Sequence, residues 1–224
     1  TNNVVHDTDG AGLGVNGGYN ILMAYNTLYN VGKRDHLVEF VYGGRSCDGN
    51  DAAACTPNLQ KGAWGSTHED GVDIGNNHVY FYNNIVMVSQ GYMTAQWPAQ
   101  FAIYGPRPLT IAGAQGQNPA RDDVDLQIKG NIIWNPVADL GVSGDNGCAT
   151  TNNTCNPTQL MRDNAINTVQ PQLVNPAQGN YSLATDSNVF TVPSFAIPSF
   201  GWSDVPNSTT PTGRLANTVT TDAL

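Results

Sequence analysis

Apolar residues alternate with polar ones in several short stretches of the chain, and three of these stretches repeat one pattern around an asparagine. The stretches align as follows: Ile21–Asn30 on Asn26, Val79–Met87 on Asn84, and Leu126–Asn135 on Asn131. In each, apolar residues stand five and three positions before the asparagine and two positions after it. An apolar period of two on both sides of a polar residue predicts two short strands joined by a tight bend.

The asparagine is expected to form this bend itself, because asparagine tolerates a left-handed backbone and bonds its own main chain. Recurrence of such a unit is typical of a solenoid, in which each unit packs on the next. The sequence therefore predicts an all-β fold, a single-stranded parallel β-helix. The wide intervals between the aligned asparagines predict long loop insertions on one side of it.

Further strands are expected at His36–Tyr42 and Gln100–Tyr104, and Asn164–Asn167 has the pattern of a degraded last turn. Nothing between the repeats is typical of a linker, so we expect one domain. It would consist of a parallel β-helix over residues 1–170 and an extended C-terminal capping tail over residues 171–224. The chain opens directly in strand material, which favours either further turns before Thr1 or end-to-end self-association.

Composition supports strands and turns and disfavours some partners. Of the 224 residues, 12% are charged, 40% are hydrophobic and 24 are glycine, which is typical of neither a helical nor a disordered chain. The formal net charge is −9, and no basic stripe is present that could neutralise phosphates. We therefore expect no nucleic-acid partner. No apolar run is long enough to span a membrane.

Four cysteines form two close pairs, Cys47 with Cys55 and Cys148 with Cys155. Neither pair has the C-x-x-C spacing of zinc or redox sites, so we interpret them as two disulfides that staple loops. Because disulfides persist in oxidising compartments, we expect a secreted, extracellular protein.

Several motifs together resemble the secreted right-handed parallel β-helix repeat proteins of the pectate-lyase-like superfold, and in particular members without an assigned activity. These motifs are Gly32–His36, Arg45–Gly49, Gly62–Gly65, Asp70–Ile74, Asn83–Asn84, Asp122–Trp134, Pro171–Pro176 and Gly179–Leu183. The resemblance covers about residues 1–185 and implies a right-handed coil. It is specific for the fold and weak for the chemistry, because one solenoid hosts lyases, hydrolases, epimerases and adhesins.

Polysaccharide lyases on this fold need a base that takes the proton next to a uronate carboxyl, and a cation that stabilises the resulting charge. The basic residues closest together in the sequence are the catalytic candidates: Lys33, Arg34, His36 and Arg45. Lysine or arginine would act as base and neutraliser, and His36 would give the leaving oxygen its proton. The alternative interpretation is that Lys33 and Arg34 cap a solvated loop and that His36 opens a strand.

Bound calcium is a second expectation, because closely spaced carboxylates on loops supply the oxygen ligands that Ca²⁺ prefers. The candidate ligands are Asp7, Asp9, Asp70 and Asp73. Ordinary Asp-Gly turns are the alternative interpretation. A hydrolase would need a carboxylate pair, but Asp122 and Asp123 are adjacent and would face opposite sides of a strand.

Aromatic residues provide the candidate carbohydrate-binding side chains: Trp64, Tyr80, Tyr82 and Trp97. Sugar rings stack on such faces, although the same rings could instead pack against the long insertions or the tail. The sequence thus favours an extracellular, carbohydrate-directed β-helix protein that is lyase-like if catalytic and acts on a polysaccharide or cell-surface glycan. The alternative is a structural, adhesive or filament-forming module, since ladders of asparagine stabilise a stack without any chemistry.

Overall fold

The computed structural model describes residues 1–41, 76–94, 99–104, 124–137, 141–143 and 156–198, and its fold is mostly parallel β-sheet. Within these residues the parallel strands form three sheets. Sheet A consists of β1 (Val4–His6), β4 (Thr27–Tyr29), β7 (Ile85–Met87), β10 (Ile132–Trp134) and β12 (Ala165–Ile166). Sheet B consists of β2 (Leu13–Asn16), β5 (Val38–Val41), β8 (Ala99–Tyr104) and β11 (Gly141–Ser143). Sheet C consists of β3 (Tyr19–Ala24), β6 (Asn77–Tyr82) and β9 (Val124–Lys129).

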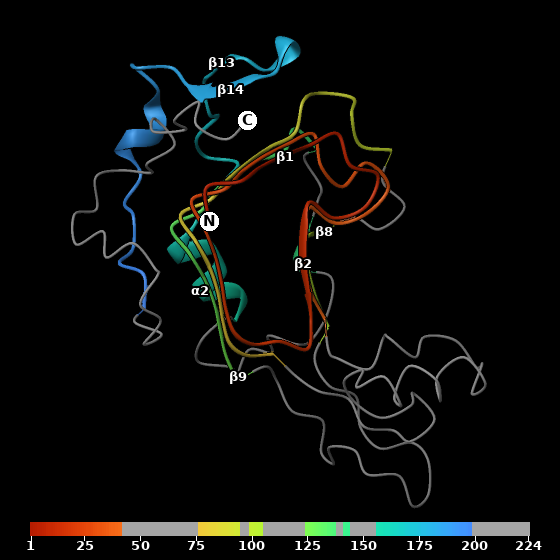
Figure 1. The fold of residues 1–224 in the computed structure, drawn as a ribbon, viewed down its shortest axis with the longest axis vertical. Coiled ribbons are helices and arrows are strands. Elements are labelled where there is room, and N and C mark those ends of the chain that lie inside the picture. The colour runs from red at the N-terminus through yellow and green to blue at the C-terminus, as the bar shows by residue number, and fades with distance from the viewer. Residues whose placement is uncertain (42–75, 95–98, 105–123, 138–140, 144–155, 199–224) are drawn as a thin grey trace, which may run out of the picture.

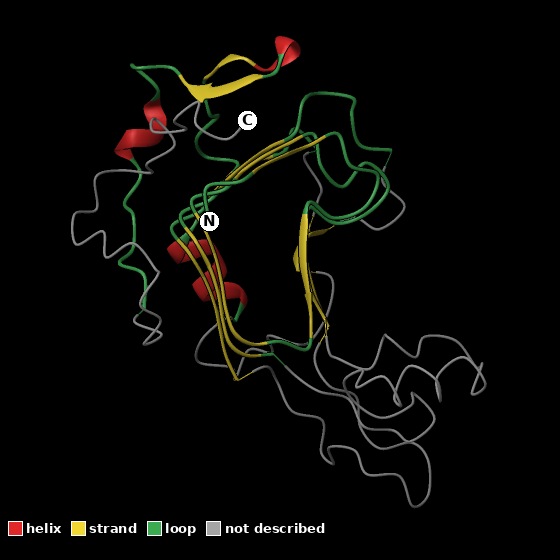
Figure 2. Cartoon of the chain, in the orientation of Figure 1, coloured by secondary structure: helices red, strands yellow, loops and turns green. Residues whose placement is uncertain are grey.

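The chain visits the sheets in a fixed order, from C to A to B. In the described part, β3, β4 and β5 make one such pass, β6, β7 and β8 the next, and β9, β10 and β11 another. Figure 1 shows the passes one behind another around a common interior, and Figure 2 shows the strands on its sides. Successive passes stack in register, with Ile21 beside Val79 and Val79 beside Leu126. This register confirms the alignment of the three repeats in the sequence.

The interior is filled by apolar side chains from all three sheets. Its centre is a cluster of three phenylalanines, Phe40 of β5, Phe81 of β6 and Phe101 of β8. Their ring centroids lie 5.8 Å apart for Phe40 and Phe81 and 6.5 Å apart for the other two pairs. Every second residue of a strand points inward, so the period of two in the sequence places these side chains in the core.

Stacked asparagines line the corner between sheets C and A. The members of this ladder are Asn3, Asn26, Asn84, Asn131 and Asn164. At each step, the backbone N–H and the side-chain amide of one asparagine both donate to Oδ1 of the next, with N···O distances of 2.8–3.0 Å. The ladder is buried from Asn26 onward. Its last member, Asn164, precedes β12, which pairs with β10 as the expected further turn of the repeat.

We expected the ladder asparagine to be the left-handed residue of the bend, but in the three aligned repeats the residue before it has that backbone. Tyr25 has φ 57°, Asn83 has φ 54° and Gly130 has φ 68°. The ladder asparagine keeps a right-handed or extended backbone and uses its amide between passes. The sequence prediction was wrong here because asparagine suits both roles, the left-handed residue of the bend and the amide that bonds the next pass. The pattern does not show which of the two adjacent positions has which role.

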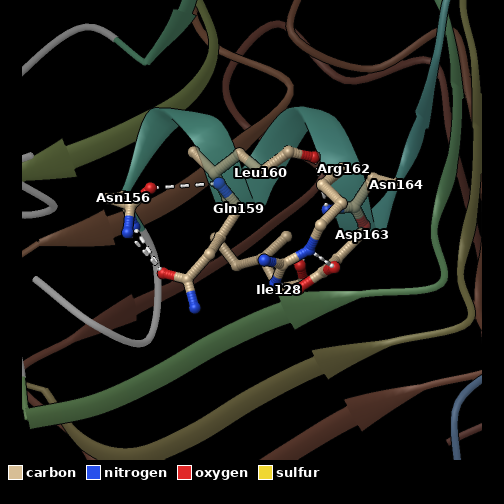
Figure 3. A network of polar contacts seen from close by, with 7 residues as sticks. All are labelled: Ile128, Asn156, Gln159, Leu160, Arg162, Asp163 and Asn164. Carbon is tan, nitrogen blue, oxygen red and sulfur yellow. Dashed lines mark hydrogen bonds and ion pairs between the residues drawn. The ribbon is translucent and has the colours of Figure 1, made fainter.

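A short helix, α2 (Pro157–Asp163), lies against β9, β11 and β12 (Figure 3). A capping box begins the helix: the backbone N–H of Gln159 donates to Asn156 Oδ1, and that of Asn156 donates to Gln159 Oε1. Leu160, within the helix, is fully buried. The side-chain amide of Asn164 donates to the carbonyls of Leu160 and Ile128, at 2.9 and 2.7 Å, which joins α2 to the ladder.

The segment after Pro171 packs on the outer face of sheet A. It contains an antiparallel pair, β13 (Leu173–Asn175) and β14 (Asn180–Leu183), and the 3₁₀ helices η4 (Pro176–Gln178) and η5 (Asn188–Thr191). Leu183 and Val189 of this segment form a buried cluster with Ile85 and Ile132 of sheet A. Up to residue 198, the tail therefore covers a face of the stack, whereas helix α2 lies against the last strands.

In the part of the chain that the structure describes, no helix is both long and apolar enough to cross a membrane.

Candidate functional site

The loop that carries Lys33 and Arg34 begins directly after β4 and lies between two other loops. On one side, the backbone N–H groups of Lys33 and Arg34 donate to the carbonyls of Thr8 and Asp9, at 3.1 and 3.0 Å. On the other side, Thr94 donates to the Lys33 carbonyl from its backbone N–H, at 2.7 Å, and from its hydroxyl, at 3.1 Å. The loop is therefore held by backbone contacts, and its two basic side chains remain exposed.

The basic side chains have different surroundings. The Arg34 guanidinium donates to Asp9 Oδ2 at 3.2 Å, and both groups are exposed to solvent. The ammonium of Lys33 lies 5.8 Å from the ring centroid of Tyr92, at the distance of a cation–π contact. His36 is only 5% exposed, with Nε2 3.0 Å from Asp35 Oδ1. The expected role of His36 as proton donor to a leaving oxygen does not fit this buried position.

The aspartates of the first loop pair with basic side chains. Asp7 Oδ2 lies 2.9 Å from His6 Nδ1, and Asp9 pairs with Arg34. Among the described residues, no group of three or more His, Cys, Asp or Glu side chains gathers as a metal site would. A cation at Asp7 and Asp9 would have to take its remaining oxygens from backbone carbonyls, other oxygen-bearing side chains and water. Calcium at this loop stays a prediction.

A row of large side chains crosses the outer face of sheet A beside this loop. We call it the outer row, and its members pair in register across neighbouring strands: His6, Tyr29, Met87 and Trp134. Each follows an inward residue of its strand, such as Leu28 before Tyr29, so each points outward. Tyr29, Met87 and Trp134 are half-buried, so part of each side chain remains accessible.

Tyr181 of β14 packs over one end of the outer row. Its ring stacks on His6, with centroids 4.9 Å apart and planes 25° from parallel, and lies 5.5 Å from Tyr29. Burial and the nearby Asp7 carboxylate raise the pKa of Tyr181. Burial, together with Asp7 and Asp9, likewise raises the pKa of Tyr92. Both phenols therefore stay neutral hydrogen-bonding groups beside the loop.

The predicted sugar-binding residues Tyr80 and Tyr82 point outward from sheet C, but they are covered. They are 7% and 3% exposed, and they pack with Ala24 against Phe195 and Ile197 of the tail. This packing matches the alternative interpretation in which the rings contact the tail. Neither ring face is open to a sugar in this conformation.

A hydrogen-bond network joins these tyrosines to two residues that the sequence analysis had not singled out, His78 and Asp125. The Tyr80 hydroxyl donates to Asp125 Oδ2, and His78 Nδ1 lies 2.7 Å from the same oxygen. Because a carboxylate only accepts, His78 Nδ1 carries the hydrogen. Gln127 donates to Asp125 Oδ1 and accepts from the Tyr82 hydroxyl, at 2.5 Å. His78 is half-exposed at the open end of the network.

The network shifts the pKa of its members. Burial raises the pKa of Tyr80 to about 12, aided by the hydrogen bond to Asp125, and burial raises the pKa of Tyr82 further still. Burial also acts to raise the pKa of Asp125, but the hydrogen bonds from Tyr80, Gln127 and His78 outweigh it and leave that pKa lowered. Asp125 is therefore an ionised acceptor, and both tyrosines are neutral donors, at neutral pH.

A sequence signal for these missed residues exists. Asn20, His78 and Asp125 each stand six positions before a ladder asparagine, and each has a left-handed backbone, with φ of 55°, 54° and 56°. Asn, Asp and His are the residue types enriched at such φ values outside glycine. The outer row had a signal as well, because Tyr29, Met87 and Trp134 each follow the ladder asparagine by three positions.

The remaining predicted site residues lie outside the described residues. They are Arg45 of the catalytic set, Trp64 and Trp97 of the aromatic set, Asp70 and Asp73 of the metal set, and Cys47, Cys55, Cys148 and Cys155 of the disulfides.

Comparison with known proteins returns no match for this chain, whether against protein-family models, curated proteins or solved structures.

Proposed function

We propose that the chain is a single-stranded right-handed parallel β-helix that binds an acidic polysaccharide along the outer row of sheet A. The order of the sheets, C to A to B in each pass, supports the β-helix. So does the register, which stacks each repeat on the previous one. Right-handedness rests on the resemblance to the pectate-lyase-like superfold and on the strong preference of parallel crossovers for that hand.

The outer row carries the functional proposal. It offers aromatic and thioether side chains at the regular spacing of neighbouring strands, about 4.8 Å. That spacing is close to the length of one sugar residue, so successive rings of an extended glycan can lie on successive side chains. Polar groups border the row on the loop side, as sugar hydroxyls require.

Lys33 and Arg34 indicate an acidic sugar. Their loop starts directly after the row residue Tyr29, and both side chains reach solvent. The chain as a whole has a net charge of −9, so a uronate would be repelled except where cations are concentrated locally. A uronate carboxylate beside the Lys33 ammonium satisfies this requirement.

Binding without cleavage is the form of this function that the contacts favour. The buried position of His36 removes one expected catalytic group from the surface, and Asp9 neutralises Arg34. We infer an extracellular location from the cysteine pairs. Lyase activity is the second candidate, and the exposed Lys33 ammonium is the group that favours it.

The test is calorimetric titration with a panel of uronate and neutral oligosaccharides, in the presence and absence of Ca²⁺. We expect uronate binding by the wild type and a loss of about tenfold or more in affinity for Trp134→Ala, because stacking area is lost. Lys33→Ala should weaken the binding of uronates while leaving that of neutral sugars unchanged. Phe190→Ala is the control, since Phe190 is 38% exposed in η5 and lies outside the outer row.

Ultraviolet absorbance of the same mixtures reports cleavage, because β-elimination leaves a conjugated double bond in the product. Rising absorbance that disappears in Lys33→Ala would establish a lyase. Binding with constant absorbance would establish a binding protein. A folded wild type that binds no panel member would overturn the carbohydrate proposal and leave the structural or filament-forming module.

A further inference from the structure

The outer face of sheet C is covered by a short extended piece of the tail. We call residues 194–198 the strap. Phe195 and Ile197 of the strap pack on Ala24, Tyr80 and Tyr82. The covered side chains come from β3 and β6, at least 112 residues away along the chain.

In the described residues, the side chain of Asn83 provides the hydrogen bonds that hold the strap. Asn83 Nδ2 donates to the Phe195 carbonyl at 2.8 Å, and the Phe195 N–H donates to Asn83 Oδ1 at 2.9 Å. The Asn83 amide thus donates to and accepts from the backbone of Phe195, as a neighbouring strand would do with its own backbone. Pro193 precedes the strap and Pro198 is its last residue, and neither has a backbone N–H to donate. Among the residues that the structure describes, these two are the hydrogen bonds of the strap, so we expect it to open locally before the stack unfolds.

The neighbouring turn leaves room for this contact. Gly130 stands at the same repeat position as Asn83, and both have a left-handed backbone. A Cβ on Gly130 would lie 2.2 Å from Asn83 Oδ1 and 3.1 Å from Phe195 Cδ2. The position of the Asn83 side chain, with its two hydrogen bonds to Phe195, and that of the Phe195 ring therefore require glycine at position 130.

The surface beneath the strap is amphipathic. Tyr80 and Tyr82 form an edge-to-face pair with centroids 5.9 Å apart, and the network of His78, Asp125 and Gln127 borders them. The Lys129 ammonium lies 6.0 Å from the Phe195 ring. When the strap leaves, this ammonium loses the ring and becomes available to a carboxylate.

We propose that the strap is displaceable and that the face beneath it is a second site for an acidic sugar, with Tyr80 and Tyr82 as its floor and Lys129 as its carboxylate partner. This inference rests on the proposed uronate binding. Since only strap-open molecules bind here, the apparent affinity is reduced by the closed population. In this proposal Tyr80 and Tyr82 are buried while the strap is in place and bind a sugar when it is displaced.

The test uses Asn83→Gly, which removes both side-chain hydrogen bonds to Phe195. It causes no backbone strain, because glycine adopts a φ of 54° freely. Asn2→Gly is the matched control, an asparagine at the same repeat position with φ 57° whose backbone bonds Ala24. Both changes are made in the Trp134→Ala background, which weakens binding at the outer row. Calorimetric titration with the uronate oligosaccharide that the wild type binds gives the readout.

We expect Asn83→Gly to bind this oligosaccharide at least about fivefold more tightly than the background, which is a shift of about 1 kcal/mol. Asn2→Gly should match the background, and adding Lys129→Gln to Asn83→Gly should remove the gain. Phe195→Ala should reproduce the gain without any backbone change. Thermal melts and hydrogen exchange of the strap show that each variant is folded and that the strap is open.

An open strap without tighter binding, or a gain that survives Lys129→Gln, would overturn the second site while leaving the outer row in place. Failure of the proposed function is distinguishable, because then the wild type itself binds no oligosaccharide of the panel.

Discussion

Each buried ladder asparagine uses its side-chain amide in two directions. Oδ1 of Asn84 accepts two hydrogen bonds from Asn26, and Nδ2 of Asn84 donates to Asn131 Oδ1 and to the Met23 carbonyl. The side chain thereby satisfies the backbone N–H of Asn26 and the Met23 carbonyl at the corner between sheets C and A. The asparagine amide is suited to this role because it carries two N–H donors and a carbonyl oxygen that accepts two hydrogen bonds.

Replacing Asn84 with alanine should destabilise the fold by about 3 kcal/mol, because the buried donors of Asn26 and the Met23 carbonyl lose their partner. Urea unfolding of Asn84→Ala against the wild type measures this cost. Asn16→Ala, an exposed change at the end of β2, should stay within about 0.5 kcal/mol of wild type. Equal effects of the two changes would contradict the role of the ladder.

Asp125 should make the stability of the protein depend on pH in acid. Its pKa is lower in the folded chain than its ordinary value of 3.8, because the hydrogen bonds from Tyr80, Gln127 and His78 outweigh the effect of burial. The ionised carboxylate therefore stabilises the fold above the ordinary value, and this contribution is lost as pH falls through the folded-state value.

Asp125→Asn should thus be less stable than the wild type at pH 7, and the difference should shrink below about pH 4. Urea unfolding of both proteins across this range provides the measurement. A difference that stays constant or grows in acid would show that the network acts through packing rather than through charge.

At the same scale, the sequence revealed the roles of some residues and concealed others. The core positions followed from the period of two, because burial selects apolar side chains at alternate positions. The place of Asn3 in the ladder and the left-handed positions could not be predicted from the sequence, since asparagine is equally suited to a ladder, a bend and a turn. The burial of Tyr82 depends on contacts with the tail, which the local pattern does not encode.

Among the elements, the tail stabilises sheet A from outside. The outward residues Ile85 and Ile132 of β7 and β10 are buried in a cluster with Leu183, Val189 and neighbouring apolar side chains of the tail. Antiparallel pairing of β13 and β14 places Leu183 on this face. Up to residue 198, the tail is therefore packed as part of the folded core.

Leu183→Ala should destabilise the protein by about 2–3 kcal/mol, because it removes a buried side chain and leaves a cavity over Ile85 and Ile132. Chemical denaturation measures the loss. Val174→Ala in β13 is the control, since Val174 is 54% exposed and should change stability by about 0.5 kcal/mol at most. If the two variants unfolded alike, the tail would not be packed as described.

The elements also show the limits of the sequence prediction. Strands at 36–42 and 100–104 were expected, and β5 and β8 lie there. Helix α2 was not expected, because seven residues are too few for a helical period to emerge from an Asn-rich background. Its capping box, Asn156 with Gln159, was the available signal.

For the whole molecule, parallel sheets visited in a fixed order give a rigid surface on which side chains recur at each strand spacing. The outer row and the face of sheet C both derive from this repetition. The all-β class with stacked parallel strands followed from the repeat, because a recurring unit packs on its neighbours. The two proposed binding surfaces did not follow from the repeat, since each combines one face of a sheet with a loop or tail distant in sequence.

Amide chemical-shift mapping by NMR during titration with a uronate oligosaccharide tests the central proposal most directly, because it locates the ligand on the folded chain. We expect shifts to concentrate at Tyr29, Met87 and Trp134 and in the loop of Lys33 and Arg34. Sheet C should respond only after Asn83→Gly. Shifts that spread evenly over the protein, or that avoid sheet A altogether, would contradict the proposal.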